Sequence, residues 1–167
     1  MSKVITFSLT FQKTHPRASE STYFVEKLFT SLCEINTSDD LMWKLISNLI
    51  FVYSVDTAIL DSCWPKNHTI RSGHRFKVGE FFSPRAWSGK PYKSKQIILA
   101  QDIEIKKIWN FKINRAGEFF VNDILHDITT SYLPENDGLS QEDFLNWFPA
   151  NKEFDGQLIC WNDEMEY

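Results

Sequence analysis

The sequence predicts an α+β fold with a small mixed β-barrel at its core and helices at its flanks. Several short segments rich in β-branched and aromatic residues are typical of strands, while apolar residues at helical spacing occur near the start and the end of the chain. A length of 167 residues, 43% of them hydrophobic, suits one folded domain spanning residues 1–167.

The first part of the chain is predicted to be a strand followed by two helices. Residues 3–11 alternate with the period of two that is typical of a strand with one buried face. One helix is expected to begin near Ser21 and another near Ser38, because each serine can cap the apolar pattern that follows it.

The remainder is predicted to be mostly strands separated by Gly- and Pro-containing turns. Strands are expected at residues 68–71, 80–87, 95–100, 103–113, 118–121 and 157–161. Residues 123–131 and the segment that begins at Ser140 are expected to be helical, the second with Phe144, Leu145, Trp147 and Phe148 on its apolar side.

Charge is distributed unevenly along the chain. Residues 66–95 hold eight of the eighteen lysines and arginines but only one acid, Glu80, although the whole chain has a net charge of −4. Local excess of one sign creates a field that attracts ions of the other. This stretch therefore predicts a surface that binds phosphate or carboxylate.

Several classes of protein are disfavoured by the sequence. The first residues lack the pattern of a secretory signal, and no apolar run is long enough to span a bilayer. Three widely spaced cysteines, Cys33, Cys63 and Cys160, form neither a disulfide framework nor a metal-ligand pair. We expect a cytoplasmic protein that needs no membrane, no metal ion and no cofactor.

Two motifs resemble the ASCH domain, a family with a PUA-like β-barrel fold. Lys66-x-x-Thr69-x-Arg71 followed by Val78-Gly79-Glu80 is similar to the entry of that domain, and Asp137 stands three residues before a helix cap, where the family has an acidic residue. Minimal members of the family lack residues equivalent to about 12–60, so we interpret that segment as a helical insertion.

The resemblance implies recognition of RNA or of modified nucleobases. Some small members of the family hydrolyse the N4-acyl group of acetylcytidine with the signature Lys and Thr and a carboxylate, which is usually glutamate. The corresponding catalytic candidates here are Lys66, Thr69 and Asp137, with aspartate one methylene shorter. In such chemistry Thr69 supplies a hydroxyl or positions water, and Lys66 acts as a base if its pKa is lowered. The plainer alternative is a surface lysine, a strand threonine and a helix-flanking acid.

Aromatic residues interleaved with cations suggest a place for a single-stranded or flipped base, because rings stack on bases and cations hold phosphates. Trp87 and Tyr92 are the candidate stacking residues, although a role in the core is an equal alternative. The candidate ligand-binding residues are Arg71, Arg75, Lys77, Arg85, Trp87, Lys90 and Tyr92.

Three functions follow from these features. The first is recognition of RNA or a modified nucleoside in a basic cleft. The second is an amidohydrolase that removes an N4-acyl group from cytidine-type nucleosides. The third is a protein-interaction module that uses the helices at residues 21–50.

Overall fold

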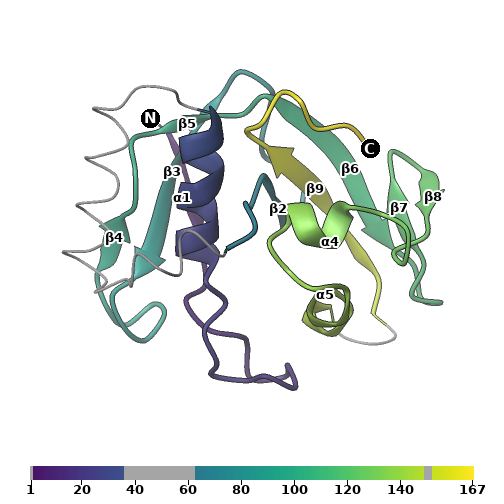
Figure 1. Ribbon diagram of the computed structural model, residues 1–167, viewed down its shortest axis with the longest axis horizontal. Coiled ribbons are helices and arrows are strands. Elements are labelled where there is room, and N and C mark those ends of the chain that lie inside the picture. Colours follow the sequence, from purple (N-terminus) through teal and green to yellow (C-terminus); the bar gives the residue numbers. More distant parts are fainter. Residues whose placement is uncertain (1, 36–62, 149–151) are drawn as a thin grey trace.

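The computed structural model describes residues 2–35, 63–148 and 152–167 (Figure 1). In chain order the elements are β1 (Lys3–Thr6), α1 (Phe24–Ile35), β2 (His68–Ser72), β3 (Phe81–Trp87), β4 (Gln96–Ile98), β5 (Ile103–Glu104), β6 (Lys107–Ile113), β7 (Phe119–Val121), β8 (Ile124–His126), α4 (Leu133–Asn136), α5 (Gln141–Trp147) and β9 (Phe154–Cys160). The predicted α+β class is confirmed. The described strands form two separate sheets that do not close into a barrel.

The smaller sheet joins the N-terminal strand to the middle of the chain. Its order is β1-β3-β4, and β5 also pairs with β3. The β1 and β3 strands run parallel, with Thr6 opposite Arg85, and the Phe7 amide extends the contact by donating to the Arg85 carbonyl at 2.7 Å. Parallel neighbours need a long connection, and here residues 7–80 connect the end of β1 to the start of β3.

The larger sheet has the order β2-β9-β6-β7-β8, and all its pairs are antiparallel. This places β2 at one edge, with β9 as its neighbour within the sheet. Gly156 of β9 lies opposite Ser72, and a Cβ atom added there would stand only 2.1 Å from the Arg71 carbonyl oxygen. The absence of a side chain at residue 156 therefore lets β2 approach β9.

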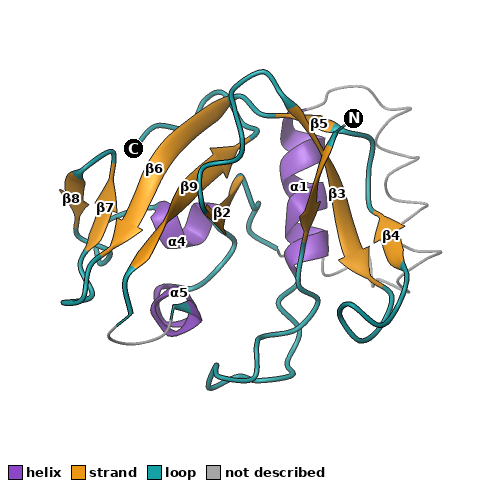
Figure 2. Ribbon diagram, turned by 180° about the vertical axis from the view of Figure 1, so that it is seen from behind, coloured by secondary structure: helices purple, strands orange, loops and turns teal. Residues whose placement is uncertain are grey.

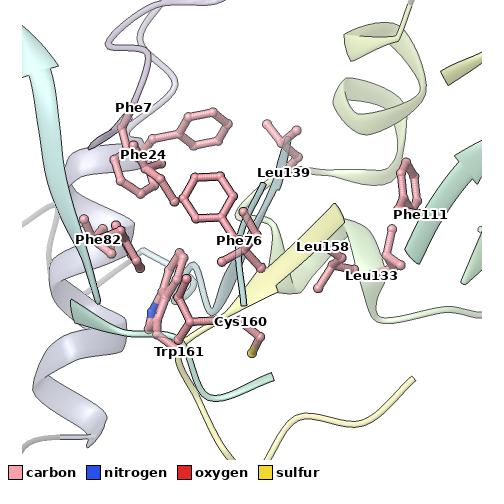
Figure 3. Packing of buried hydrophobic residues seen from close by; sticks show 14 of the residues in the cluster. Phe7, Phe24, Phe76, Phe82, Phe111, Leu133, Leu139, Leu158, Cys160 and Trp161 are labelled. Carbon is pink, nitrogen blue, oxygen red and sulfur yellow. The ribbon is translucent and has the colours of Figure 1, made fainter. Parts of the chain in front are cut away.

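Helices α1 and α4 lie on the same side of the two sheets, as the opposite views of Figures 1 and 2 show. Helix α1 buries its apolar face, which includes Leu28 and Phe29. Aromatic residues from both ends of the chain meet in the core, where the Trp161 ring packs against Phe7 and Phe82 at centroid separations of 6.2 and 5.7 Å (Figure 3). The core therefore ties α1 to both sheets.

Helix α5 begins where the sequence indicates. The Ser140 hydroxyl accepts a hydrogen bond from the Asp143 amide at 3.1 Å, which satisfies one of the unpaired donors of the first turn. Phe144 is fully buried on the apolar side of this helix, and Trp147 at its end is only partly buried. The short helix α4 was not anticipated from the sequence.

The single strand predicted at residues 103–113 is wrong. The chain forms β5 on the smaller sheet and then β6 on the larger sheet, and the change occurs at Ile105 and Lys106. The Ile105 amide still donates to the Glu80 carbonyl, whereas the Lys106 amide donates to the Cys160 carbonyl. The buried residues on both sides of this change, Ile105 and Trp109, are an even number of positions apart. The two-residue alternation therefore keeps its phase and does not indicate a change of sheet.

The helix predicted at residues 123–131 is also wrong. Residues 124–126 form β8, joined to β7 by a two-residue turn at Asn122 and Asp123. Both turn residues have positive φ, 49° and 64°, as tight β-hairpins require. Asp127 then accepts hydrogen bonds at Oδ1 from the Thr129 amide and hydroxyl, which builds a turn in place of a helix.

Two further predictions concern the segment from 12 to 60. The helix predicted to begin near Ser21 is confirmed as α1, which begins at Phe24. The helix expected after Ser38 lies outside the described residues, and the interpretation of residues 12–60 as an insertion stays a prediction. Within the described ranges, no helix has both the length and the apolar character needed to cross a membrane.

Candidate functional site

A buried ion pair lies at the centre of the candidate site. The Lys66 ammonium donates to Asp137 Oδ1 at 2.5 Å and also to the Asp137 carbonyl oxygen, and the two residues are 1% and 6% exposed. Lys66 directly precedes the segment that enters β2, and its amide donates to the carbonyl of Lys27 in α1 at 2.9 Å. The pair therefore joins α1, the entry to β2 and the α4–α5 connection.

The turn that holds Asp137 depends on the next residue. Gly138 has φ of +76°, a left-handed conformation that glycine adopts without the steric cost of a Cβ atom. A Cβ atom at this position would lie 3.3 Å from Lys66 Cβ. The sequence Asp-Gly thus brings the Asp137 carboxylate and carbonyl together over the lysine.

Burial opposes the charged forms of both partners. It lowers the pKa of Lys66 to about 8, because the attraction of Asp137 offsets only part of the desolvation and Arg71 and Lys27 add repulsion. Burial likewise raises the pKa of Asp137, against the opposing effect of Lys66. The Lys66 ammonium also lies 4.2 Å from the centroid of the Phe24 ring. Lys66 therefore has an amine that can release its proton close to neutral pH.

Strand β2 supplies two more polar side chains. Thr69 and Arg71 are two residues apart on this strand and so share a face. Arg71 donates to the Thr6 carbonyl at 2.6 Å and to the Ile70 carbonyl at 3.3 Å. Across the described residues, the Thr69 hydroxyl has no hydrogen-bond partner and Arg71 has no ion-pair partner.

All four of these side chains line one pocket of about 220 Å³. The remainder of its wall is mainly aromatic and comes from the loop after β1, from α1, from β2, from the segment around the end of α5 and from the start of β9. The lining residues are Phe7, Ser8, Gln12, Phe24, Lys66, Thr69, Ile70, Arg71, Asp137, Trp147, Phe148 and Phe154. The pocket thus combines a charged floor with ring faces that can pack against a small planar ligand.

The remaining predicted binding residues do not line this pocket. Arg75 and Lys77 lie in the exposed connection between β2 and β3, and Arg85 on β3 donates to Ser83 and to Gln96. Trp87 is the last residue of β3 and Tyr92 lies in the turn that follows. Their ring centroids are 5.3 Å apart. The structure therefore separates the predicted residues into a pocket and an outer surface.

The outer surface has one feature of a stacking site. Tyr92 is 89% exposed and has a positive φ of 62° in the turn that follows β3, so the prediction that it belongs to the core is excluded. Trp87 is partly buried beside it, and Lys90 in the same turn is exposed. These three residues lie outside the pocket around Lys66, so their contribution to binding stays a prediction.

Three residues near the ion pair were not anticipated from the sequence. Lys27 of α1 donates to the Gly138 carbonyl at 2.6 Å, and burial lowers its pKa. His68 is fully buried, with its Nδ1 atom 2.6 Å from the Tyr167 hydroxyl and its Nε2 atom 3.8 Å from Asp137 Oδ1. Burial and the Lys66 charge hold the pKa of His68 well below its ordinary value, so the ring is neutral.

Only His68 carried a signal that could have been noticed, because it lies within the motif between Lys66 and Thr69. Lys27 and Tyr167 approach the site through packing between segments that are far apart in the sequence. Over the ranges 2–35, 63–148 and 152–167, no cluster of three or more His, Cys, Asp or Glu residues could hold a metal ion.

Comparison with known proteins assigns no relative: no family model, curated protein or solved structure matches this chain. The function must therefore be argued from the chemistry of the pocket.

Proposed function

We propose that this chain is an ASCH-like protein with a PUA-like fold whose pocket binds one modified nucleobase. The observation that carries the proposal is the convergence of Lys66, Thr69, Arg71 and Asp137 on a single pocket with aromatic walls. A nucleobase needs hydrogen-bonding groups at its edge and apolar contact on its faces, and this pocket offers both.

The size of the pocket favours one base over a longer segment of nucleic acid. Its volume of about 220 Å³ suits a single planar group, and the exposed cations of the 66–95 stretch lie outside it. The base belongs either to a free nucleoside or to a nucleotide turned out of an RNA strand. In the RNA case, the lysines and arginines outside the pocket contact phosphates and affinity falls steeply with salt.

Binding can be tested with two substitutions that separate the pocket from the outer surface. Lys66→Met removes the pocket cation, and Trp87→Ala removes the outer ring. If the nucleobase binds in the pocket, we expect Lys66→Met to weaken binding of N4-acetylcytidine in isothermal titration calorimetry and Trp87→Ala to have little effect. Loss of affinity only in Trp87→Ala would show that the outer surface is the binding site.

Hydrolysis of an acyl group is the second candidate, favoured by two observations. Burial lowers the pKa of Lys66 to about 8, and the Thr69 hydroxyl in the same pocket has no partner among the described residues. General bases work best when their pKa lies near the working pH. Within the described residues the structure has no hydrogen bond between Lys66 and Thr69, so these residues act as base and nucleophile only if the bound substrate brings the amine and the hydroxyl within hydrogen-bonding distance.

Thr69 is the nucleophile in the proposed reaction. Neutral Lys66 accepts the hydroxyl proton while the Thr69 oxygen attacks the acyl carbonyl carbon. The carbon–nitrogen bond then breaks, the Lys66 ammonium returns the proton to the leaving amine, and an acyl ester remains on Thr69. Water hydrolyses this ester to the free acid and the original hydroxyl. Arg71 lies in the pocket and can stabilise the negative oxygen of each tetrahedral intermediate.

The deciding experiment follows the absorbance of a panel of N4-acylated cytidines with wild type, Lys66→Met and Thr69→Val. Turnover by wild type that both substitutions abolish would establish an amidohydrolase. Binding without turnover on every member of the panel would leave a reader of the modified base. Neither binding nor turnover would refute the proposed function.

A further inference from the structure

The pocket holds more positive than negative charge. Lys66 and Arg71 both line it, whereas Asp137 is the one acidic residue among the described residues of its wall, and that carboxylate is already bonded to Lys66. A third cation, Lys27, lies directly behind Asp137, where it donates to the Gly138 carbonyl. Asp137 is hydrogen-bonded to Lys66, so within the described ranges it attracts Arg71 only from beyond ion-pair distance.

Asp137 attracts Arg71 electrostatically, but among the described residues no carboxylate forms an ion pair with Arg71. A guanidinium has five N–H donors, and the partners of Arg71 are the main-chain carbonyls of Thr6 and Ile70. Neither partner carries a charge. Arg71 is partly buried, and a cation that loses part of its contact with water is normally stabilised by an anion, because desolvation of an unpaired charge is costly.

A second polar group lies on the same face of the strand. The Thr69 hydroxyl lines the pocket two residues before Arg71 and has no partner within the described ranges. A hydroxyl and a guanidinium side by side can both donate to one anionic oxygen group. Both side chains line the pocket.

We infer that the natural ligand carries a negatively charged oxygen group, a carboxylate or a phosphate, which binds Arg71 and Thr69 in this pocket. The inference rests on the proposed function and narrows its ligand to an anionic nucleoside derivative. A carboxylate would belong to the group attached to the base, and a phosphate would belong to a nucleotide. The aromatic walls then pack against the base while Arg71 neutralises the charge.

The test compares matched charged and neutral ligands by isothermal titration calorimetry. One pair is N4-succinylcytidine and N4-acetylcytidine, which differ by a carboxylate on the acyl group. The other pair is cytidine 5′-monophosphate and cytidine, which differ by a phosphate. Since a hydrogen bond to a charged group contributes about 1.5–3 kcal/mol, the charged member of one pair is expected to bind roughly tenfold more tightly or better.

Substitutions then test whether Arg71 is responsible for the preference for charged ligands. Arg71→Gln is expected to abolish the difference between charged and neutral ligands, and Arg71→Lys to reduce it, because lysine keeps the charge but loses the planar fork. Arg75→Gln is the matched control, since Arg75 belongs to the same basic stretch but is exposed and lies outside the pocket. Thermal unfolding of each variant confirms that it is folded, and Arg71→Lys replaces Arg71→Gln if the latter is not.

Each outcome has a defined meaning. A carboxylate-dependent or phosphate-dependent preference that falls with Arg71 identifies the source of the charge. Equal affinity for the charged and neutral members of both pairs overturns the inference, as does a preference that Arg75→Gln reduces and Arg71→Gln does not.

A simple aromatic carboxylate, benzoate, separates this inference from the proposed function. If no nucleoside binds but benzoate binds in an Arg71-dependent way, the anion site stands and the nucleoside function fails. If benzoate also fails to bind, both are overturned.

Discussion

Replacing Lys66 by methionine tests the buried ion pair on which the site depends. Methionine fills most of the volume of the lysine stem but carries no charge, so Asp137, at 6% exposure, is left as a buried carboxylate without its cation. Removing one partner of a buried pair typically costs about 3–5 kcal/mol. We expect the lower end, about 3 kcal/mol at pH 7, because Asp137 can escape part of the penalty by taking up a proton.

Because Asp137 can take up a proton, the loss of stability in Lys66→Met is expected to depend on pH. Burial already raises the pKa of Asp137, and removal of Lys66 raises it further. The folded-state pKa then lies above the unfolded value of about 4, so protonation favours the folded variant. The variant is therefore closest to wild type in acid, and its deficit grows as the pH rises from about 4 towards the folded-state pKa of Asp137.

The assay is urea unfolding at pH 5 and pH 7, followed by tryptophan fluorescence, with Lys90→Met as the control. Lys90 is exposed in a turn, so its substitution is expected to change the free energy of unfolding by less than about 0.5 kcal/mol. Adding Asp137→Asn to the Lys66 variant removes the stranded charge and is expected to restore part of the loss. A Lys66→Met loss equal to that of Lys90→Met, or one independent of pH, would refute the burial of the pair.

Three further predictions concern the same site. Thr69→Val removes a hydroxyl that has no described partner, so we expect the urea midpoint to change little while acyl-cytidine turnover, or binding in a pure reader, is lost. Gly156→Ala is expected to cost about 1–3 kcal/mol by steric overlap with the Arg71 carbonyl, 2.1 Å from the new Cβ atom, whereas Gly89→Ala, whose Cβ atom would lie 3.6 Å from its nearest neighbour, is tolerated in the same unfolding assay. If Lys66 is the base, kcat rises with pH and levels off above about 8, because the amine accepts a proton only when neutral; a rate that falls through this range would exclude that role.

Local pattern was enough to predict the fold class and most elements. The strand predicted at residues 80–87 and the cap at Ser140 correspond to β3 and to the start of α5. Local pattern failed where strand pairing depends on segments that are distant in the sequence. The buried residues of the segment 103–113 all lie an even number of positions apart while the chain passes from one sheet to the other. It also failed at Asn122 and Asp123, whose positive φ converts an expected helix into a hairpin.

The candidate site was predictable in its polar residues and not in its walls. The spacing Lys66-x-x-Thr69-x-Arg71 belongs to one segment, and the capped helix after Asp137 marks the acid, so a motif could indicate both. Phe24 and Trp147 reach the pocket from the start of α1 and the end of α5. Their convergence depends on how both helices pack, which no local pattern specifies.

The basic stretch 66–95 does not act as one surface, because its parts belong to different sheets. Its first strand, β2, lies in the five-stranded sheet, and the strand that follows, β3, lies in the other. Arg75, Lys77 and the lysines of the turn after β3 are exposed, so water and salt screen their charges. Lys66 and Arg71 face a pocket with a lower effective dielectric constant, where a unit of charge acts more strongly. We therefore expect the charge balance within the pocket, more than the number of cations in the stretch, to determine which ligand binds.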